Sequence, residues 1–239
     1  MAEAGQPSER HDVKNPLASE LPALNAIVDV EAAARAGWRP VDLARAFIAG
    51  GARFLQLRAK TMPGGQLLDT ASAIVALAHG CGALAVINDR ADIARLAGAD
   101  GVHGGQDDLA PAAARSLVGE HAIIGLSTHT LEQVDQAVRL AVGPSRAITY
   151  VAIGPVFGTA TKATGYEAIG LATVREASRR AGAWGLPLVA IGGITLERAA
   201  SVIEAGAASV AVISDLLVTG DPEGRVRQYI ARLSMADGY

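Results

Sequence analysis

Short apolar runs alternate with alanine-rich stretches along most of this chain. The runs are apolar on both faces, which predicts the strands of a buried parallel sheet. We expect eight such strands, at residues 24–28, 52–57, 84–87, 101–102, 123–126, 148–153, 188–191 and 209–213. The stretches between them have helical spacing and mostly end at glycine, and they predict helices that include residues 41–49, 67–78, 131–142, 168–181 and 197–205.

Regular alternation of strand and helix predicts the fold class. Eight such units in roughly 215 residues suit a single closed (β/α)8 barrel, a TIM barrel, over residues 21–239. An open doubly wound sheet is the alternative, although no G-x-G-x-x-G motif follows the first strand. Residues 1–20 are polar and aperiodic, and we expect them to form a flexible leader.

Composition narrows the classes of function. The chain has 239 residues, half of them hydrophobic, and a formal net charge of -3, which argues against a nucleic-acid or anionic membrane surface. Cys81 is the single cysteine, so an internal disulfide is excluded. The first residues lack the order of a secretory signal, and no apolar run approaches the roughly 18 residues of a membrane span. The sequence therefore predicts a soluble cytoplasmic protein that has no membrane or nucleic-acid partner.

Polar side chains gather at the predicted end of the second strand. Gln56, Arg58 and Lys60 are spaced two residues apart, so their side chains leave one face of the strand, while Leu57 and Ala59 leave the other. Barrel enzymes place their active sites at the carboxyl ends of the strands. Unpaired charge in a barrel interior is costly unless a ligand or partner compensates it, which favours a ligand site over a solvated strand end.

Acidic residues follow the third and fourth strands. Asn88 and Asp89 come directly after one apolar run, and Asp107 and Asp108 come after the next. Each acid is also suited to cap a helix. Adjacent strands would nevertheless bring Asp89 and Asp108 to one pocket, and two carboxylates with substrate phosphates and waters are a usual magnesium site. The five histidines show no spacing typical of a zinc site.

The last four strands end in small and hydroxylated residues. Ser127 and His129 follow the fifth strand and are more typical of helix caps or satisfied polar groups than of catalysts. The sixth strand leads into a long loop that ends at Lys162. Gly193 and Ser214 follow the seventh and eighth strands, where barrels bind phosphate through backbone N–H groups. We therefore predict a second, metal-free phosphate site, and hence one diphosphate and one monophosphate substrate.

An ordered set of seven motifs resembles the thiamine phosphate synthase family. The motifs are QLRAK, NDRADIA, GADGVHGGQDDL, IIGLSTHT, GPVFGTATK, AIGGI and VIS, and they cover essentially the whole chain after residue 20. The resemblance implies a barrel enzyme that joins an aminopyrimidine methyl diphosphate to a thiazole phosphate, with loss of diphosphate. It also implies one Mg²⁺ per subunit as cofactor and two phosphorylated small-molecule substrates. The oligomeric state stays open, and a homo-oligomer is allowed.

The same resemblance implies roles for individual residues. Asp89 and Asp108 would ligate Mg²⁺, and Arg58, Lys60 and Lys162 would be the catalytic cations. The pyrimidine diphosphate would contact Gln56, Leu57, Arg58, Ala59, Lys60, Asn88, Ser127 and Lys162. The thiazole phosphate would contact Thr159, Ala160, Thr161, Gly193, Ile213 and Ser214.

Charge considerations suggest a dissociative substitution. The cations and the metal would neutralise the departing diphosphate, and the thiazole nitrogen would capture the pyrimidine carbocation without a protein nucleophile. Ala59, Gly104 and Gly158 depart from the family's usual residues, which predicts a looser loop and a lower rate. Two alternatives remain: a related barrel that tautomerises the thiazole carboxylate phosphate, and a non-catalytic barrel that binds thiamine precursors.

Overall fold

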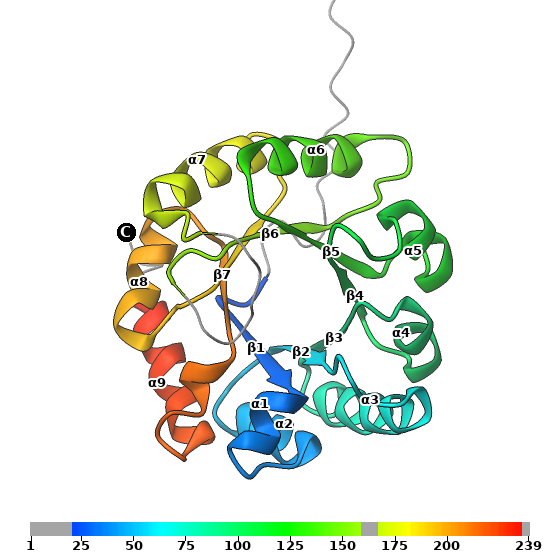
Figure 1. Cartoon of the computed structure of the whole chain (residues 1–239), viewed down its shortest axis with the longest axis vertical. Helices are drawn as coiled ribbons and strands as arrows, with labels where there is room; N and C mark the ends of the chain where they lie inside the picture. The colour runs from blue at the N-terminus through cyan, green and yellow to red at the C-terminus, as the bar shows by residue number, and fades with distance from the viewer. Residues whose placement is uncertain (1–20, 159–166, 236–239) are drawn as a thin grey trace, which may run out of the picture.

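A closed barrel of parallel strands forms the centre of the molecule (Figure 1). The computed structural model describes residues 21–158 and 167–235. Each strand pairs with the next in sequence, and β8 pairs with β1 to close the barrel. The strands are β1 (Leu24–Asp29), β2 (Phe54–Arg58), β3 (Leu84–Asn88), β4 (Gly101–Gly104), β5 (Ile123–Thr128), β6 (Tyr150–Ile153), β7 (Leu188–Ile191) and β8 (Ser209–Val212). The predicted (β/α)8 barrel is thus confirmed, and the open sheet is excluded.

Helices surround the barrel on its outside (Figure 1). They are α1 (Val30–Arg35), α2 (Pro40–Ala49), α3 (Gly64–His79), α4 (Ala91–Ala97), α5 (Pro111–Val118), α6 (Leu131–Val142), α7 (Gly170–Gly182), α8 (Leu196–Glu204), the short 3₁₀ helix η1 (Ser214–Leu216) and α9 (Pro222–Ser234). Within the described residues, no helix combines the length and the apolar character that a membrane crossing requires.

Two of the predicted strands begin later than the apolar pattern suggested. The second was expected from residue 52, but the Ala52 N–H donates to Phe47 O at 3.0 Å, so Ala52 still belongs to the turn that ends α2. The sixth was expected from residue 148. There the Thr149 hydroxyl accepts a hydrogen bond from the Ile124 N–H at 2.8 Å, where a regular ladder would use backbone groups alone. The predicted leader, residues 1–20, lies outside the described residues.

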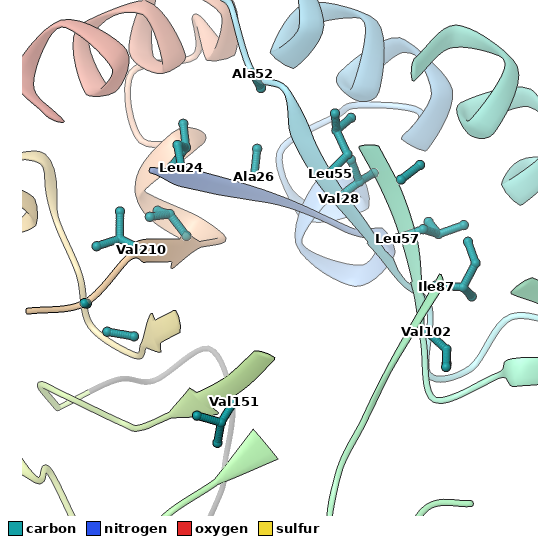
Figure 2. Packing of buried hydrophobic residues seen from close by; sticks show 14 of the residues in the cluster. Leu24, Ala26, Val28, Ala52, Leu55, Leu57, Ile87, Val102, Val151 and Val210 are labelled. Carbon is teal, nitrogen blue, oxygen red and sulfur yellow. The ribbon is translucent and has the colours of Figure 1, made fainter. Parts of the chain in front are cut away.

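Side chains alternate strictly between the inside and the outside of the barrel. One buried cluster lies between strands and helices and includes Leu55, Leu57 and Ile87, whose side chains point away from the barrel interior in Figure 2. A second, separate cluster fills the interior and includes Phe54 and Val86. Because residues two apart share a face, Gln56 and Arg58 follow Phe54 on the inner face, as predicted.

Close packing between β4 and β5 requires a glycine at position 101. A Cβ atom there would lie 1.8 Å from the Ile123 backbone oxygen, which cannot move without breaking the sheet. By contrast, a Cβ on Gly182, at the end of α7, would meet no atom within 4 Å.

We predict that Gly101→Ala lowers the free energy of unfolding by about 1–3 kcal/mol, because overpacking forces the strands apart. Denaturant titration followed by circular dichroism measures this change. Gly182→Ala is the matched control and should keep wild-type stability. Equal stability of the two variants would contradict the packing assigned to Gly101.

Candidate active site at the carboxyl ends of the strands

An acidic and basic cluster lies at the ends of β1 to β4. Arg58, the last residue of β2, forms an ion pair with Asp29, which is the last residue of β1 and its partner in register. Asp29 is 2% exposed, and its carboxylate also accepts from the Ala32 N–H at 2.8 Å and so caps α1. Arg58 therefore has an acidic partner within the protein, which the sequence analysis did not anticipate.

Lys60 connects the end of β2 to the residue after β3. Its ammonium group forms an ion pair with the Asp89 carboxylate. Its backbone N–H donates to Glu31 Oε1 at 3.1 Å, and the Thr61 hydroxyl donates to the same oxygen at 3.0 Å. These bonds fix the chain just after β2, so that Lys60 points toward Asp89.

Asp89 and Asp108 border the same small space, and each carboxyl group shifts the pKa of the other. Asp89 has a φ of 64°, a strained value for a residue other than glycine, and its N–H donates to His103 O at 2.7 Å. Burial raises the pKa of Asp89, the Lys60 ammonium opposes that rise, and the neighbouring Asp108 adds to it. The surrounding structure thus maintains a strained backbone at Asp89 and a second carboxyl group beside it. Both features are common at functional sites.

The Asp108 carboxyl behaves differently from its neighbour. Burial acts to raise its pKa, but the pKa lies below its ordinary value because the Gly105 N–H donates to Oδ2 at 2.7 Å and Asp89 and Lys60 also favour the ionised form. Asp108 thus favours its ionised form, whereas burial favours the neutral form of Asp89 beside it.

This pair fits magnesium better than zinc. No group of three or more His, Cys, Asp or Glu side chains is arranged to hold a metal ion within residues 21–158 and 167–235. Magnesium usually takes only one or two protein carboxylates and completes its shell with waters and substrate phosphates. Asp89 and Asp108 supply two adjacent carboxyl groups, which are oxygen ligands of the kind that such an ion would take from the protein.

A cavity of about 360 Å³ opens beside this cluster, at the ends of β5 to β8. Its wall includes Ser127, Gly193, Ile213 and Ser214, all predicted to contact substrates. The volume suits a small ligand. Asp89 and Asp108 do not line this cavity and instead border a much smaller space of about 10 Å³. The structure thus brings the predicted residues that it describes to one mouth of the barrel, but in two adjacent places.

Buried bonds hold the cavity wall at β7 and β8. The Asp215 carboxylate accepts from the Leu196 N–H, at the start of α8, at 3.1 Å. It also accepts from the Tyr229 hydroxyl at 2.7 Å and pairs with Arg225 at 2.8 Å. Burial and the Asp215 charge both raise the pKa of Tyr229, so its hydroxyl stays a donor. The sequence analysis named Ser214 after the eighth strand but did not identify this network, because the partners of Asp215 come from α8 and α9.

Arg198 supplies a positive charge to the cavity. Its guanidinium lies 4.8 Å from the centre of the Phe157 ring and donates to Gly193 O at 3.3 Å. Among the described residues that line the cavity, it is the only lysine or arginine. The sequence analysis did not name Arg198. This residue lies three positions after Thr195, at the start of α8, and a cation there, beside the predicted phosphate site, was a signal that could have identified it.

Some predicted site residues take other positions. Leu57 and Ala59 turn their side chains to the outer core, so only their backbone groups face the barrel mouth. Asn88 ends β3 on the inner face, in register with His103. Thr159, Ala160, Thr161 and Lys162 lie outside the described residues, and their roles stay predictions.

Comparison with known proteins places this chain in one family. The family profile described as thiamine monophosphate synthase matches residues 24–216. A thiamine-phosphate synthase of Anaeromyxobacter dehalogenans is 47% identical over 187 residues, which cover 78% of this chain and 80% of that protein. One of Chlorobium luteolum is 43% identical over 192 residues, covering 80% and 86%.

A solved structure agrees with these relatives. The thiamine phosphate pyrophosphorylase from Pyrococcus furiosus superposes with a TM-score of 0.79 at 27% identity, covering 90% of this chain and 96% of that one. Sequence and fold therefore agree, and the chain belongs to the thiamine monophosphate synthase family and is an enzyme of the transferase class.

Proposed function

We propose that this enzyme condenses an aminopyrimidine methyl diphosphate with a thiazole ethyl phosphate, or its carboxylated form, to give thiamine phosphate and diphosphate. The observation that supports this best is the pairing of two sites at one barrel mouth. A carboxylate and cation cluster lies at β1 to β4, and a cavity with backbone amides and one arginine lies at β5 to β8. One suits a metal-bound diphosphate, and the other suits a monophosphate.

The diphosphate would bind across Arg58 and Lys60. In the protein alone these cations pair with Asp29 and Asp89. A diphosphate with Mg²⁺ would give Lys60 a second anionic partner and Asp89 a second cationic one. Asp89 and Asp108 would hold the metal, and Gln56, Asn88 and Ser127 would contact the same substrate, with Lys162 from the segment after β6.

Bond cleavage would come first in the reaction. The C–O bond between the pyrimidine methylene and the diphosphate breaks, and both bonding electrons leave with the oxygen. Mg²⁺, when bound, supplies electrostatic stabilisation of that leaving group. Arg58 and Lys60 stabilise the same growing charge from fixed positions, and the aminopyrimidine ring delocalises the carbocation.

Bond formation would follow in the cavity. The thiazole nitrogen donates its lone pair to the methylene carbon, forming the new C–N bond, so no protein nucleophile is required. The thiazole phosphate would be held by Thr159 to Thr161, by Gly193 and by the Ile213 and Ser214 amides, with Arg198 as an additional cation. If the thiazole carries a carboxylate, that group leaves as carbon dioxide, its bonding electrons stay on the ring carbon, and a proton from water takes its place.

Two other functions receive less support. A thiazole tautomerase would need neither metal nor diphosphate, so the Asp89–Asp108 pair and Lys60 would have no role in it. A non-catalytic barrel would bind the two phosphorylated compounds without joining them, so product formation separates it from the proposed enzyme.

Product formation tests the proposal directly. Protein incubated with both phosphorylated substrates and Mg²⁺ should form thiamine phosphate, detected after oxidation to a fluorescent thiochrome. Chelation of the metal should abolish the product, and added Mg²⁺ should restore it. Absence of metal-dependent thiamine phosphate would refute the proposed function.

We expect Asp108→Asn to lower kcat by roughly 100-fold, because the substitution removes a negatively charged ligand that would hold the metal beside the leaving group. Asp107→Asn is the matched control, since Asp107 is exposed and adjacent in sequence. Steady-state kinetics at saturating Mg²⁺ measures both variants. An equal loss in the two variants, or no loss in either, would argue against Asp108 as a metal ligand.

Arg198→Ala should raise KM for the thiazole phosphate about tenfold, because a charge-assisted hydrogen bond to the phosphate is lost. KM for the pyrimidine diphosphate should stay unchanged. Arg95→Ala, on the exposed face of α4, serves as the control. A larger effect on the pyrimidine substrate would place Arg198 in the other half of the site.

A further inference from the structure

A buried histidine links the two halves of the site. His103, on β4, is 8% exposed, and its ring lies inside the barrel between Tyr150 and Ser127. Nδ1 is 2.7 Å from the Tyr150 hydroxyl, and Nε2 is 2.8 Å from the Ser127 hydroxyl. The proposed reaction assigns no role to His103.

The barrel keeps space for this ring pair. His103 and Tyr150 stack with ring centres 5.5 Å apart and an angle of 18° between their planes. A Cβ atom on Gly125 would lie 2.1 Å from Tyr150 Cζ and 2.4 Å from His103 Nδ1. Phe54 packs edge-on against Tyr150 at 5.9 Å. Glycine at 125 and the aromatic contact therefore fix both rings in one arrangement.

Hydrogen-bond donors and acceptors give this chain of side chains a direction. Tyr150 is fully buried, and burial keeps its phenol protonated by raising its pKa. The Gln56 side chain lies close to the phenol and lowers its pKa, as an N–H group that faces the phenol oxygen does. The single phenol proton is then directed to Nδ1 of His103, which must accept it. A neutral imidazole that accepts at Nδ1 carries its own proton on Nε2, and this proton points at Ser127.

We propose that His103 is a positioning residue whose Nε2–H tautomer, set by Tyr150, turns Ser127 into a hydrogen-bond donor toward the substrate. Because Ser127 Oγ accepts from His103, its own proton is free to point into the cavity that Ser127 lines. It would meet an acceptor atom of the pyrimidine diphosphate, a contact that rests on the proposed function. The tautomer itself does not depend on that function.

The backbone around His103 and Ser127 supports the same role. The Gln106 side chain donates to Ser127 O at 2.6 Å, which holds the serine in place. The His103 carbonyl accepts the Asp89 N–H at 2.7 Å, next to the proposed metal ligands. One residue thus positions a group in each half of the site.

Nitrogen NMR of protein labelled with ¹⁵N-histidine tests the tautomer. For His103 we expect a pyrrole-type shift at Nε2 and a pyridine-type shift at Nδ1, with the signals assigned by their loss in His103→Gln. Tyr150→Phe removes the hydroxyl alone and should move the chemical shifts of both His103 nitrogens toward the average of the two tautomers. Tyr229→Phe removes a buried phenol on the other side of the barrel and should leave the His103 shifts unchanged. An Nδ1–H tautomer, or a doubly protonated ring, in the wild-type protein would overturn the proposal.

Kinetics tests the consequence for Ser127. Tyr150→Phe and Ser127→Ala should each lower kcat/KM for the pyrimidine diphosphate about tenfold and leave KM for the thiazole phosphate unchanged. The double variant should lose no more than either single variant, because both substitutions remove the same oriented bond. Additive losses would contradict the coupling. A wild-type protein that makes no thiamine phosphate would refute the proposed function, whereas the NMR result decides the tautomer separately.

Discussion

Closure of a parallel barrel divides every strand into an inner and an outer face, and the rest of this molecule depends on that division. The outer face is mostly apolar and packs against helices, as Leu57 and Ile87 do. The inner face is apolar only through the middle of the barrel. Toward the carboxyl ends it continues into Gln56, Arg58 and Asp29, so the same alternation that builds the core also delivers polar groups to one mouth.

The charges at this mouth of the barrel are only partly balanced within the protein. Arg58 and Lys60 each have an acidic partner, Asp29 and Asp89, while Asp108 adds a further carboxylate beside Asp89. These five side chains together favour a net negative charge, which burial makes costly. A divalent cation that carries a diphosphate would relieve this cost, since the ion binds the carboxylates and the phosphates bind the basic side chains. The cluster would therefore suit a complex of a divalent cation with a diphosphate better than either the cation or the diphosphate alone.

Much of this architecture could be predicted from the sequence, because it depends on local patterns. Period-two spacing placed Gln56, Arg58 and Lys60 on one face, and the strand order brought Asp89 to Asp108. The pairing of Arg58 with Asp29 was missed because it depends on register between β1 and β2. The link through His103 was missed because it needs Gly125 to lie beside two rings from neighbouring strands. Arg198 reaches the cavity from a helix, where strand parity gives no guidance. Lys162 lies outside the described residues, so its predicted role is open.

The central claim is that the Asp89–Asp108 pair binds a divalent cation together with diphosphate. Titration calorimetry with Mg²⁺, in the presence and absence of inorganic diphosphate, tests this claim most directly. The account predicts weak binding of Mg²⁺ alone, and clearly tighter binding with diphosphate that is lost in Asp89→Asn and kept in Asp107→Asn. Equal Mg²⁺ affinity with and without diphosphate, or unchanged affinity in Asp89→Asn, would contradict it.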